Sequence, residues 1–410
     1  MKVKRPLSSL LALVLLLTVW VSAALGAEAK SPAPETYVSF GDSLTIGFEP
    51  GMTLESVPYG FVDRLYEQAL MRGRVQLTNY GIGGMTSTGL NKFIQAVADE
   101  KPVKASDLQP SFADPRADQV VSNTKQIKAD IAAATLITIT IGGNDFGKEI
   151  ITEVDTMSDE QLAAFTDNWM KTYTENLNAT LQNIFAINKN VRVYVADQYS
   201  PAPQLYKNYD KLQKLKDLFS ATLGQVAQKF QKDGFQATAV SVADSFVGSE
   251  GTYTHISQKD IHPNQDGYQV IAEQFAKAIW GEYRKDMKPT EPITVVVGGH
   301  TVNTPHLPAL LQDSTFVPLR EYSEALGAVV SWDDTTRTTT VRYKGNAVAL
   351  DIGSTTISVN GVPQTITTAA PYSYESAGET KTYVPLRLMA EGLGFDVQYV
   401  PQSRTAYINP

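Results

Sequence analysis

The feature that most constrains the fold is an alternation of short apolar runs with longer amphipathic segments between Thr36 and Tyr283. Strand–helix alternation predicts an α/β domain whose parallel sheet is covered by helices on both faces. Such a sheet binds ligands beyond the carboxyl ends of its strands. The predicted strands, rich in Val, Ile, Thr and Tyr, are Thr36–Phe40, Val75–Tyr80, Leu136–Ile141, Val191–Ala196 and Phe235–Val242. The predicted helices are Tyr59–Arg72, Asp118–Ala133, Ser158–Asn188, Leu205–Lys232 and Gln265–Tyr283.

The pattern changes near Arg284. Residues 285–292 are polar, carry two prolines and are typical of a linker. Beyond them the chain is rich in Thr and Val, and it repeats itself. The segments Thr315–Arg320 and Thr382–Arg387 both contain Val-Pro-Leu-Arg, with an offset of 67 residues between Val317 and Val384. Each is followed by a helix-like piece and two β-type runs, which predicts two strand–helix–strand–strand units packed as one smaller, β-rich α+β domain over residues 293–410.

The amino-terminal residues are typical of a secretory signal peptide. Basic residues at positions 2, 4 and 5 precede an almost purely apolar stretch from Leu7 to Leu25, and Ala27-Glu28-Ala29 offers a small-x-small cleavage site. A retained signal-anchor helix is the alternative. We therefore expect a signal peptide at 1–29 and a main domain at 30–284. The absence of cysteine from all 410 residues suits a bacterial exported protein that needs no disulfides.

Charge and composition exclude several functions. A net charge of −8 argues against a nucleic-acid partner, because phosphate backbones select for Lys- and Arg-rich faces. Without cysteine there is no thiolate nucleophile and no Cys-ligated zinc. None of the four histidines has the spacing of a metal site, so we expect no metal and no cofactor; they are His255, His262, His300 and His306.

Four short segments follow predicted strands or precede the last predicted helix. Alone, each has a structural explanation: an N-cap serine, a tight turn, an Asx turn or a surface histidine. Together they offer a hydroxyl, backbone N–H groups left open by glycines, an amide donor and an imidazole that is neutral above a pKa of ~6.5. The segments are Gly41-Asp42-Ser43-Leu44, Asn79–Ser87, Gly142-Gly143-Asn144-Asp145 and Asp260-Ile261-His262-Pro263-Asn264.

These segments resemble the four blocks of the GDSL esterase/lipase family, also called SGNH hydrolases. The family's Ser, Gly, Asn and His match Ser43, Gly84, Asn144 and His262 in the same order, within a resemblance that runs from about residue 36 to 283. The elbow G-x-S-x-G of the rival α/β-hydrolases is absent. The resemblance implies a flavodoxin-like, three-layer α/β/α domain. It also implies that Ser43 attacks an ester carbonyl, that His262 accepts its proton, and that Ser43, Gly84 and Asn144 form an oxyanion hole.

The histidine block departs from the family pattern. The family usually has Asp three residues before the catalytic His, where this chain has Lys259, and the acid here is Asp260, two residues before His262. A tighter turn could still bring Asp260 to the imidazole and complete a Ser-His-Asp triad, which we favour. Alternatively, a backbone carbonyl orients the ring and the enzyme works as a Ser–His dyad.

The carboxy-terminal part resembles the copper-amine-oxidase N-terminal-like, or stalk, domain of secreted Gram-positive proteins. The Val-Pro-Leu-Arg segments, each followed by Glu-x-x-Gly, carry the resemblance over about residues 293–408. It implies a secreted or cell-surface protein whose stalk binds a cell-wall polymer or another surface component. The pairs Arg320–Glu324 and Arg387–Glu391 have the spacing of ordinary helix-surface ion pairs, which is the alternative explanation for them.

Three functions remain open at this point. We favour a secreted serine hydrolase that cleaves carboxylic esters, with lipid acyl esters as substrates. A polysaccharide O-acetyl esterase would need the same four blocks. The third possibility is an inactive surface-binding protein, suggested by the irregular histidine block. The segment Leu90–Val120 is either a lid or binding loop beside the site or a surface insertion.

Overall fold

The computed structural model describes residues 33–410, except for 54, 147–153, 155 and 286–290. The predicted signal peptide, 1–29, therefore lies outside the described residues, as does most of the predicted linker. Residues from Pro34 to Pro410 form one compact unit. None of the helices in these described ranges is long and apolar enough to cross a lipid bilayer.

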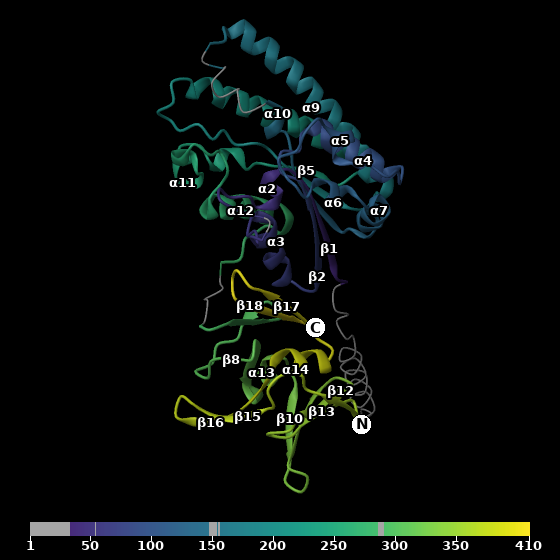
Figure 1. Ribbon diagram of the computed structural model, residues 1–410, viewed down its shortest axis with the longest axis vertical. Coiled ribbons are helices and arrows are strands. Elements are labelled where there is room, and N and C mark those ends of the chain that lie inside the picture. Colours follow the sequence, from purple (N-terminus) through teal and green to yellow (C-terminus); the bar gives the residue numbers. More distant parts are fainter. Residues whose placement is uncertain (1–32, 54, 147–153, 155, 286–290) are drawn as a thin grey trace, which may run out of the picture. The chain divides into compact units, whose positions relative to one another are not determined.

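The first half of this unit is built on a five-stranded sheet in which every neighbouring pair is parallel, in the order β2-β1-β3-β4-β5 (Figure 1). All five predicted strands are confirmed, although the last is shorter than expected. The strand that leads to the predicted nucleophile, β1, lies inside the sheet with a neighbour on each side. The strands are β1 (Glu35–Gly41), β2 (Val75–Gly81), β3 (Leu136–Thr140), β4 (Arg192–Ala196) and β5 (Ala237–Val240).

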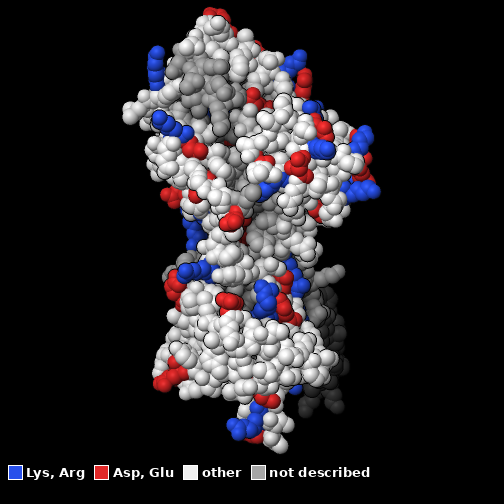
Figure 2. Space-filling view, in the orientation of Figure 1, with Lys and Arg blue, Asp and Glu red and all other residues white. Residues whose placement is uncertain are grey.

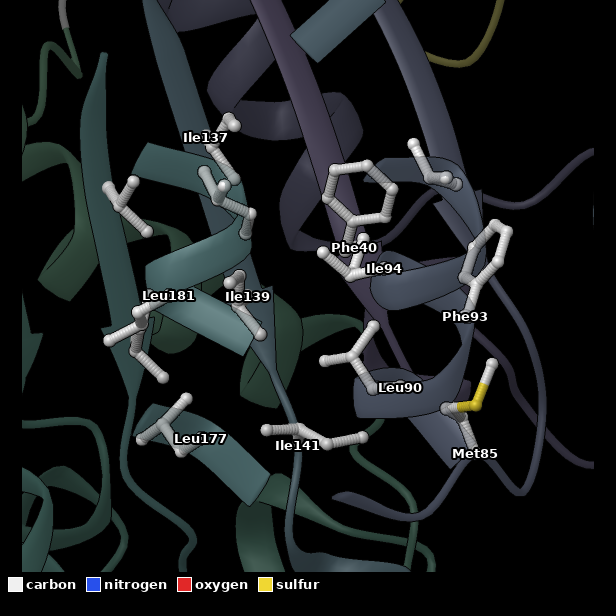
Figure 3. Close-up of a cluster of buried hydrophobic side chains, with 14 of the residues drawn as sticks. Phe40, Met85, Leu90, Phe93, Ile94, Ile137, Ile139, Ile141, Leu177 and Leu181 are labelled. Carbon is white, nitrogen blue, oxygen red and sulfur yellow. The ribbon is translucent and has the colours of Figure 1, made fainter. Parts of the chain in front are cut away.

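Helices cover both faces of the sheet, which confirms the three-layer α/β class. Side chains alternate along β1, so Val38 and Phe40 pack under one helical layer and Tyr37 under the other. The first layer contains α4 (Ser87–Ala98), α7 (Thr124–Ala133), α9 (Asp159–Ile187) and α10 (Tyr209–Lys232). Figure 3 shows Phe40 of β1 facing this layer, beside Phe93 and Ile94 of α4. The second layer contains α3 (Phe61–Leu70) and α12 (Gln265–Trp280).

Two predicted helices differ from the structure. The segment Asp118–Ala133 forms two helices, α6 (Ala117–Val121) and α7, because the side chain of Asn123 accepts a hydrogen bond from the N–H of Gln126 at 3.1 Å and starts a new helix. The helix predicted from Leu205 begins only at Tyr209. The preceding residues form turns, in which the N–H of Tyr206 bonds to the carbonyl of Pro203 and the N–H of Tyr209 to that of Tyr206.

The segment Leu90–Val120 is largely helical. It contains the greater part of α4, then α5 (Ala105–Leu108), and it ends within α6. Phe93, Ile94 and Val97 of α4 are fully buried. The first part of this segment therefore belongs to a helical layer of the domain. The loop between α5 and α6 lies against the residues that follow β2, through hydrogen bonds that are described below.

The second half is β-rich and contains both predicted repeats. The first repeat is β9 (Ser314–Pro318), α13 (Leu319–Ala325), β10 (Val329–Asp333) and β11 (Thr338–Tyr343), and the second is β16 (Glu379–Pro385), α14 (Leu386–Gly392), β17 (Asp396–Val400) and β18 (Thr405–Asn409). Strands β9 and β16 pair antiparallel, and side chains of both repeats share one core. The two repeats therefore pack against each other through this core and this strand pair.

The remaining strands complete three small sheets around these repeats, in the orders β10-β11-β12-β13-β14, β15-β16-β9-β8 and β17-β18-β6-β7. Their bounds are β6 (Thr294–Val297), β7 (His300–Thr301), β8 (Ala309–Leu311), β12 (Asn346–Leu350), β13 (Thr356–Val359), β14 (Val362–Thr365) and β15 (Tyr372–Ser376).

Residues of the second half also complete the core of the first. Tyr407 of β18 is buried beside α3, where its hydroxyl donates a hydrogen bond to Glu67 at 2.7 Å. Two residues on, the side-chain amide of Asn409 donates to the carbonyl of Leu70 at 2.9 Å. The helical layer of α3 and α12 is therefore sealed in part by the carboxy-terminal strands.

Candidate active site

Ser43 is the first residue of the short helix α2 (Ser43–Ile46), which starts directly beyond the carboxyl end of β1. A Cβ on Gly41 would lie 2.2 Å from the carbonyl oxygen of Thr140 in β3, so only glycine lets the chain leave the sheet here. Asp42 caps the helix, because its Oδ1 accepts hydrogen bonds from the N–H of Leu44 and from Thr140 Oγ1, both at 3.0 Å. As first helical residue, Ser43 keeps a backbone N–H without a partner in the helix.

His262 lies in the loop between β5 and α12. The loop closes on itself, because the N–H of His255 bonds to the carbonyl of His262 at 3.0 Å and the N–H of Asp260 bonds to the carbonyl of His255 at 3.2 Å. Tyr199, beyond the end of β4, donates its hydroxyl to the carbonyl of Ile261 at 2.7 Å. The carbonyl of Ile261 is therefore held by Tyr199, from the loop after β4, and the carbonyl of His262 is held by His255 within its own loop.

The structure brings the hydroxyl, the imidazole and the acid together. His262 Nε2 lies 2.9 Å from Ser43 Oγ, and His262 Nδ1 lies 2.7 Å from Asp260 Oδ1. The same Oδ1 accepts the backbone N–H of His262 at 2.8 Å. The shortened spacing between acid and histidine therefore still produces the favoured Ser-His-Asp arrangement, because one carboxylate oxygen receives both the backbone and the ring of the residue two positions on.

The electrostatics favour an ionised Asp260. Partial burial acts to raise its pKa, but the hydrogen bonds from the backbone and ring of His262, together with the charges of His262 and His255, outweigh burial and leave the pKa below the usual value for aspartate. An ionised carboxylate at Nδ1 keeps the imidazole proton on that nitrogen. Nε2 then carries no proton and can accept one from Ser43 Oγ.

The two other predicted site residues lie on neighbouring loops at the same edge of the sheet. Gly84 follows β2 and has a φ of +82°, a left-handed conformation that suits glycine. Asn144 lies in the short helix η1 (Gly143–Phe146) after β3. Its Nδ2 donates to the carbonyl of Met85 at 3.0 Å, which leaves its second amide hydrogen for another acceptor. Asn144 is thus bound to the residue directly after Gly84.

Further hydrogen bonds join β2 and the loop after it to the residues on either side of Ser43. The N–H of Ile82 donates to the carbonyl of Gly41 at 2.9 Å, and the side-chain amide of Asn79 donates to the carbonyl of Thr45 in α2 at 2.8 Å. A hydroxyl–imidazole–carboxylate relay and a nearby set of fixed amide groups are the parts that acyl transfer needs.

Comparison with known protein families agrees with this geometry. The family described as the GDSL-like Lipase/Acylhydrolase family matches residues 39–270, more than half of the chain. The chain belongs to this family. Its members hydrolyse esters, so the protein is a GDSL ester hydrolase. The second half of the GDSL hydrolase, residues 296–408, matches the copper amine oxidase N-terminal domain. The curated protein sequences include no match to this GDSL hydrolase.

Several solved structures are similar to part of this chain. The lipase Lip_vut3 from a goat rumen metagenome is 20% identical, with a TM-score of 0.43 and coverage of 61% of this chain and 100% of the other. A single-residue variant of an acetyl xylan esterase from Geobacillus stearothermophilus is 16% identical (TM-score 0.38; 62% and 97% covered). An extracellular lipase from Streptomyces rimosus is also 16% identical (TM-score 0.38; 58% and 99% covered).

The GDSL hydrolase has further site residues that the sequence analysis did not single out. Asp145, next to Asn144, accepts hydrogen bonds from the N–H and Oγ of Ser87 at 2.9 and 2.5 Å. Burial raises the pKa of Asp145. Gln109 and Asp114 contact the Gly84 loop from the segment between α5 and α6. Asp145 is the last residue of the Gly142-Gly143-Asn144-Asp145 segment, so the sequence pattern could have indicated it. Gln109 and Asp114 lie in an irregular segment in which no sequence pattern distinguishes them.

In the described part of the GDSL hydrolase, His255 and His306 lie near carboxylates, but not in groups suited to a metal ion. Among the residues that the structure describes, no group of three or more His, Asp or Glu side chains is placed to hold a metal ion. His255, in the same loop as His262, has its Nε2 3.8 Å from Glu49 Oε1. His306 lies in the second half, within 4 Å of Glu321 and Glu379.

Proposed function

We propose that this protein hydrolyses carboxylic esters through an acyl-enzyme formed on Ser43. The observation that carries the proposal is the continuous contact from Asp260 through the imidazole of His262 to Ser43 Oγ, with separations of 2.7 and 2.9 Å. A serine hydroxyl is a weak nucleophile until an adjacent base removes its proton, and both distances lie within the range for proton transfer along hydrogen bonds.

The reaction follows from these positions. His262 Nε2 accepts the proton of Ser43 as Oγ adds to the ester carbonyl, and the carbonyl oxygen becomes negatively charged. The N–H groups of Ser43 and Gly84 and the amide of Asn144 then stabilise this oxyanion, each donor lowering the barrier by about 3–4 kcal/mol. His262 returns the proton to the leaving alkoxide. Water, deprotonated by His262, next adds to the acyl carbonyl. His262 then returns this proton to Ser43 Oγ as the bond from Oγ to the acyl carbon breaks, which releases the carboxylic acid and restores the Ser43 hydroxyl.

Lipid acyl esters are the substrates that we propose. Two apolar side chains beside His262 support this choice. The ring of Phe48 packs edge-on against the imidazole with a centroid separation of 4.6 Å, and the neighbouring Ile261 is exposed. Apolar side chains beside the catalytic pair suit an acyl chain better than the hydroxyl-rich surroundings of an acetyl group on a polysaccharide.

Labelling with a fluorophosphonate tests the catalytic proposal. We expect covalent labelling of Ser43, lost in Ser43→Ala and strongly slowed in His262→Ala, with both variants folded by circular dichroism. The reagent reports an activated serine whatever the natural substrate is. Well-folded wild-type protein that does not react at all would instead support the inactive surface-binding function.

A rate series on nitrophenyl esters from acetyl to palmitoyl tests the substrate class. If lipid acyl esters are the substrates, kcat/KM should stay level or rise beyond butyryl, because each buried methylene adds about 0.8 kcal/mol of binding. A steep fall beyond butyryl would favour the O-acetyl esterase and contradict the lipid proposal.

We also propose that the protein is exported by a signal peptide at residues 1–29 and that residues 293–410 bind a cell-wall or other surface component. The amino-terminal sequence and the family of the second half support this proposal. Figure 2 shows acidic and basic side chains intermingled on the visible face.

Mass spectrometry of protein from the culture medium should show a chain that starts at Lys30. A full-length chain retained in the cytoplasm contradicts export.

A further inference from the structure

We propose that Gln109 and Asp114 are positioning residues that hold the Gly84 N–H toward the oxyanion. This inference rests on the proposed ester hydrolysis and assigns a role to the segment between α5 and α6. Neither side chain touches Ser43 or His262 in the described contacts; each acts through the backbone of the loop after β2.

Gln109 holds the loop on the carboxyl side of Gly84. Its Nε2 donates to the carbonyl of Gly84 at 3.0 Å and to the carbonyl of Ser111 at 2.9 Å. Its Oε1 accepts from the N–H of Thr86 at 3.0 Å and from Thr86 Oγ1 at 3.1 Å. One side-chain amide therefore makes four hydrogen bonds, three of them to the loop that carries Gly84.

Asp114 holds the loop on the amino side of Gly84. Its Oδ2 accepts the N–H of Gly83 at 3.0 Å. The side chain is only 6% exposed and pairs with the guanidinium of Arg116 at 2.8 Å. Burial acts to raise the pKa of Asp114, but the bonds from Arg116 and the Gly83 N–H outweigh it, so its pKa lies below the usual range and the acceptor stays ionised. A charged acceptor makes the stronger hydrogen bond to a backbone N–H.

These two contacts bracket the peptide that matters for catalysis. The N–H of Gly84 belongs to the peptide group that joins Gly83 to Gly84. Asp114 fixes the preceding peptide through its N–H, and Gln109 fixes the following peptide through its carbonyl. A glycine pair has unusual freedom in φ and ψ, so without these contacts the intervening peptide could rotate. Oxyanion donors stabilise the transition state because they are oriented beforehand, and this bracket supplies that orientation.

The remainder of the loop is anchored independently. Met85 is fully buried, and Figure 3 shows its side chain with Leu90 and Phe93 in the hydrophobic core. Its carbonyl accepts the amide of Asn144 at 3.0 Å. Loss of Gln109 or Asp114 should therefore free the Gly83–Gly84 peptide without detaching the loop from the domain.

The test uses the full-length protein and four variants. Gln109→Ala removes all four bonds, and Gln109→Glu keeps the acceptor for Thr86 but loses the donor to Gly84. Asp114→Ala removes the acceptor for Gly83, and Asp114→Asn keeps an oxygen there. With nitrophenyl acetate, we expect Gln109→Ala and Asp114→Ala to lower kcat about 10- to 100-fold while KM changes less than about twofold. Asp114→Asn should recover most of the lost kcat.

Amide hydrogen exchange supplies a readout that needs no turnover. The amides between Gly83 and Thr86 should exchange faster in Gln109→Ala and Asp114→Ala. Substitution of the exposed Gln119 in the following helix α6, Gln119→Ala, is the matched control with unchanged kcat and exchange. Thermal melts establish which variants are folded. If Gln109→Ala does not fold, Gln109→Glu and Asp114→Ala decide the question, because each still removes one of the two contacts to the Gly83–Gly84 segment, and both should then lower kcat.

The positioning role is overturned if folded Gln109→Ala and Asp114→Ala keep the wild-type kcat and exchange rates, or if their kcat and KM worsen together in proportion to lost stability. The failure of ester hydrolysis itself would look different. In that case the wild-type protein and Ser43→Ala would have the same rate, while exchange at the Gly84 loop would still report whether Gln109 and Asp114 hold it.

Discussion

Single residues at the ends of strands determine what chemistry this protein can perform. In the histidine loop, the acid stands two residues before the imidazole, and the loop compensates because Lys259 adopts a left-handed conformation with a φ of +63°. The carboxylate of Asp260 then accepts both the N–H and the ring of His262. A change of one residue in spacing is therefore absorbed by local backbone geometry and leaves the contact between acid and base intact.

Asp260→Asn is the first prediction at this scale. We expect kcat to fall about 10²- to 10⁴-fold, because an amide at this position no longer selects the tautomer with a free Nε2. Ser43→Ala should cost more, since it removes the nucleophile itself. Rates on nitrophenyl acetate for both variants check the order. Equal, near-total loss in both would leave no room for a Ser–His dyad, and an unchanged rate in Asp260→Asn would contradict the triad.

The second residue-scale prediction concerns the buried carboxyl next to the nucleophile. Burial raises the pKa of Asp42 to about 7, although hydrogen bonds from the N–H of Leu44 and from Thr140 oppose that effect. In the unfolded chain the pKa is ~3.9. The neutral carboxyl of Asp42 therefore makes its full contribution to the free energy of unfolding below pH ~4. This contribution is lost as the pH rises from ~4 through about 7.

Asp42→Asn isolates this effect, because asparagine keeps an acceptor for Leu44 and cannot ionise. We expect wild type to lose free energy of unfolding relative to Asp42→Asn between pH ~4 and ~7, with a constant difference above pH ~8. Urea unfolding of both proteins across this range measures it. A difference that is independent of pH, or that grows toward low pH, contradicts the raised pKa.

At the scale of elements, the loops after the strands are held by the helices that follow them. The helix α12 begins three residues beyond His262, and the side chain of its cap, Asn264, makes hydrogen bonds to both the helix and the loop. Its Oδ1 accepts the N–H of Gly267 at 3.0 Å, and its Nδ2 donates to the carbonyl of Thr252 at 2.8 Å. The start of the helix and the catalytic loop are therefore joined through one side chain.

We expect Asn264→Ala to lower the free energy of unfolding by about 1–2 kcal/mol, because it removes the cap of α12 and leaves the Thr252 carbonyl without this donor. Asn264→Asp keeps the cap acceptor and should recover most of this loss. Chemical denaturation measures both. If the two substitutions are equally damaging, the cap is not what stabilises the start of α12.

At the scale of the whole molecule, the two halves of residues 34–410 share a core. Glu67 of α3 is 3% exposed and accepts hydrogen bonds from Tyr59 at 2.6 Å and from Tyr407 at 2.7 Å. Val400 and Val296 of the carboxy-terminal strands belong to the same hydrophobic cluster as α3 and α12. The carboxy-terminal module is therefore part of the hydrolase's structure as well as a candidate binding module.

Tyr407→Phe should lower the free energy of unfolding by about 1–3 kcal/mol, because it removes one hydrogen bond from a buried carboxyl group. Tyr399→Phe on the adjacent strand is the matched control, since that side chain is 44% exposed. Calorimetry should show one transition for wild type, shifted down only in Tyr407→Phe. Two separate transitions, with the hydrolase half unaffected by Tyr407→Phe, would show that the halves unfold independently.

The sequence by itself determined the strands, the fold class and the residues that meet at the sheet edge. Period-two patterns and strand-end motifs are local, and a parallel sheet brings strand ends such as those before Ser43 and Asn144 to one edge. Only the tertiary structure decided which distant side chains form hydrogen bonds to the site loops and to the core. Gln109 lies 25 residues from Gly84, and Tyr407 lies 340 residues from Glu67. Their hydrogen bonds use common polar groups that could pair with many partners, so only packing of the whole chain selects the partner.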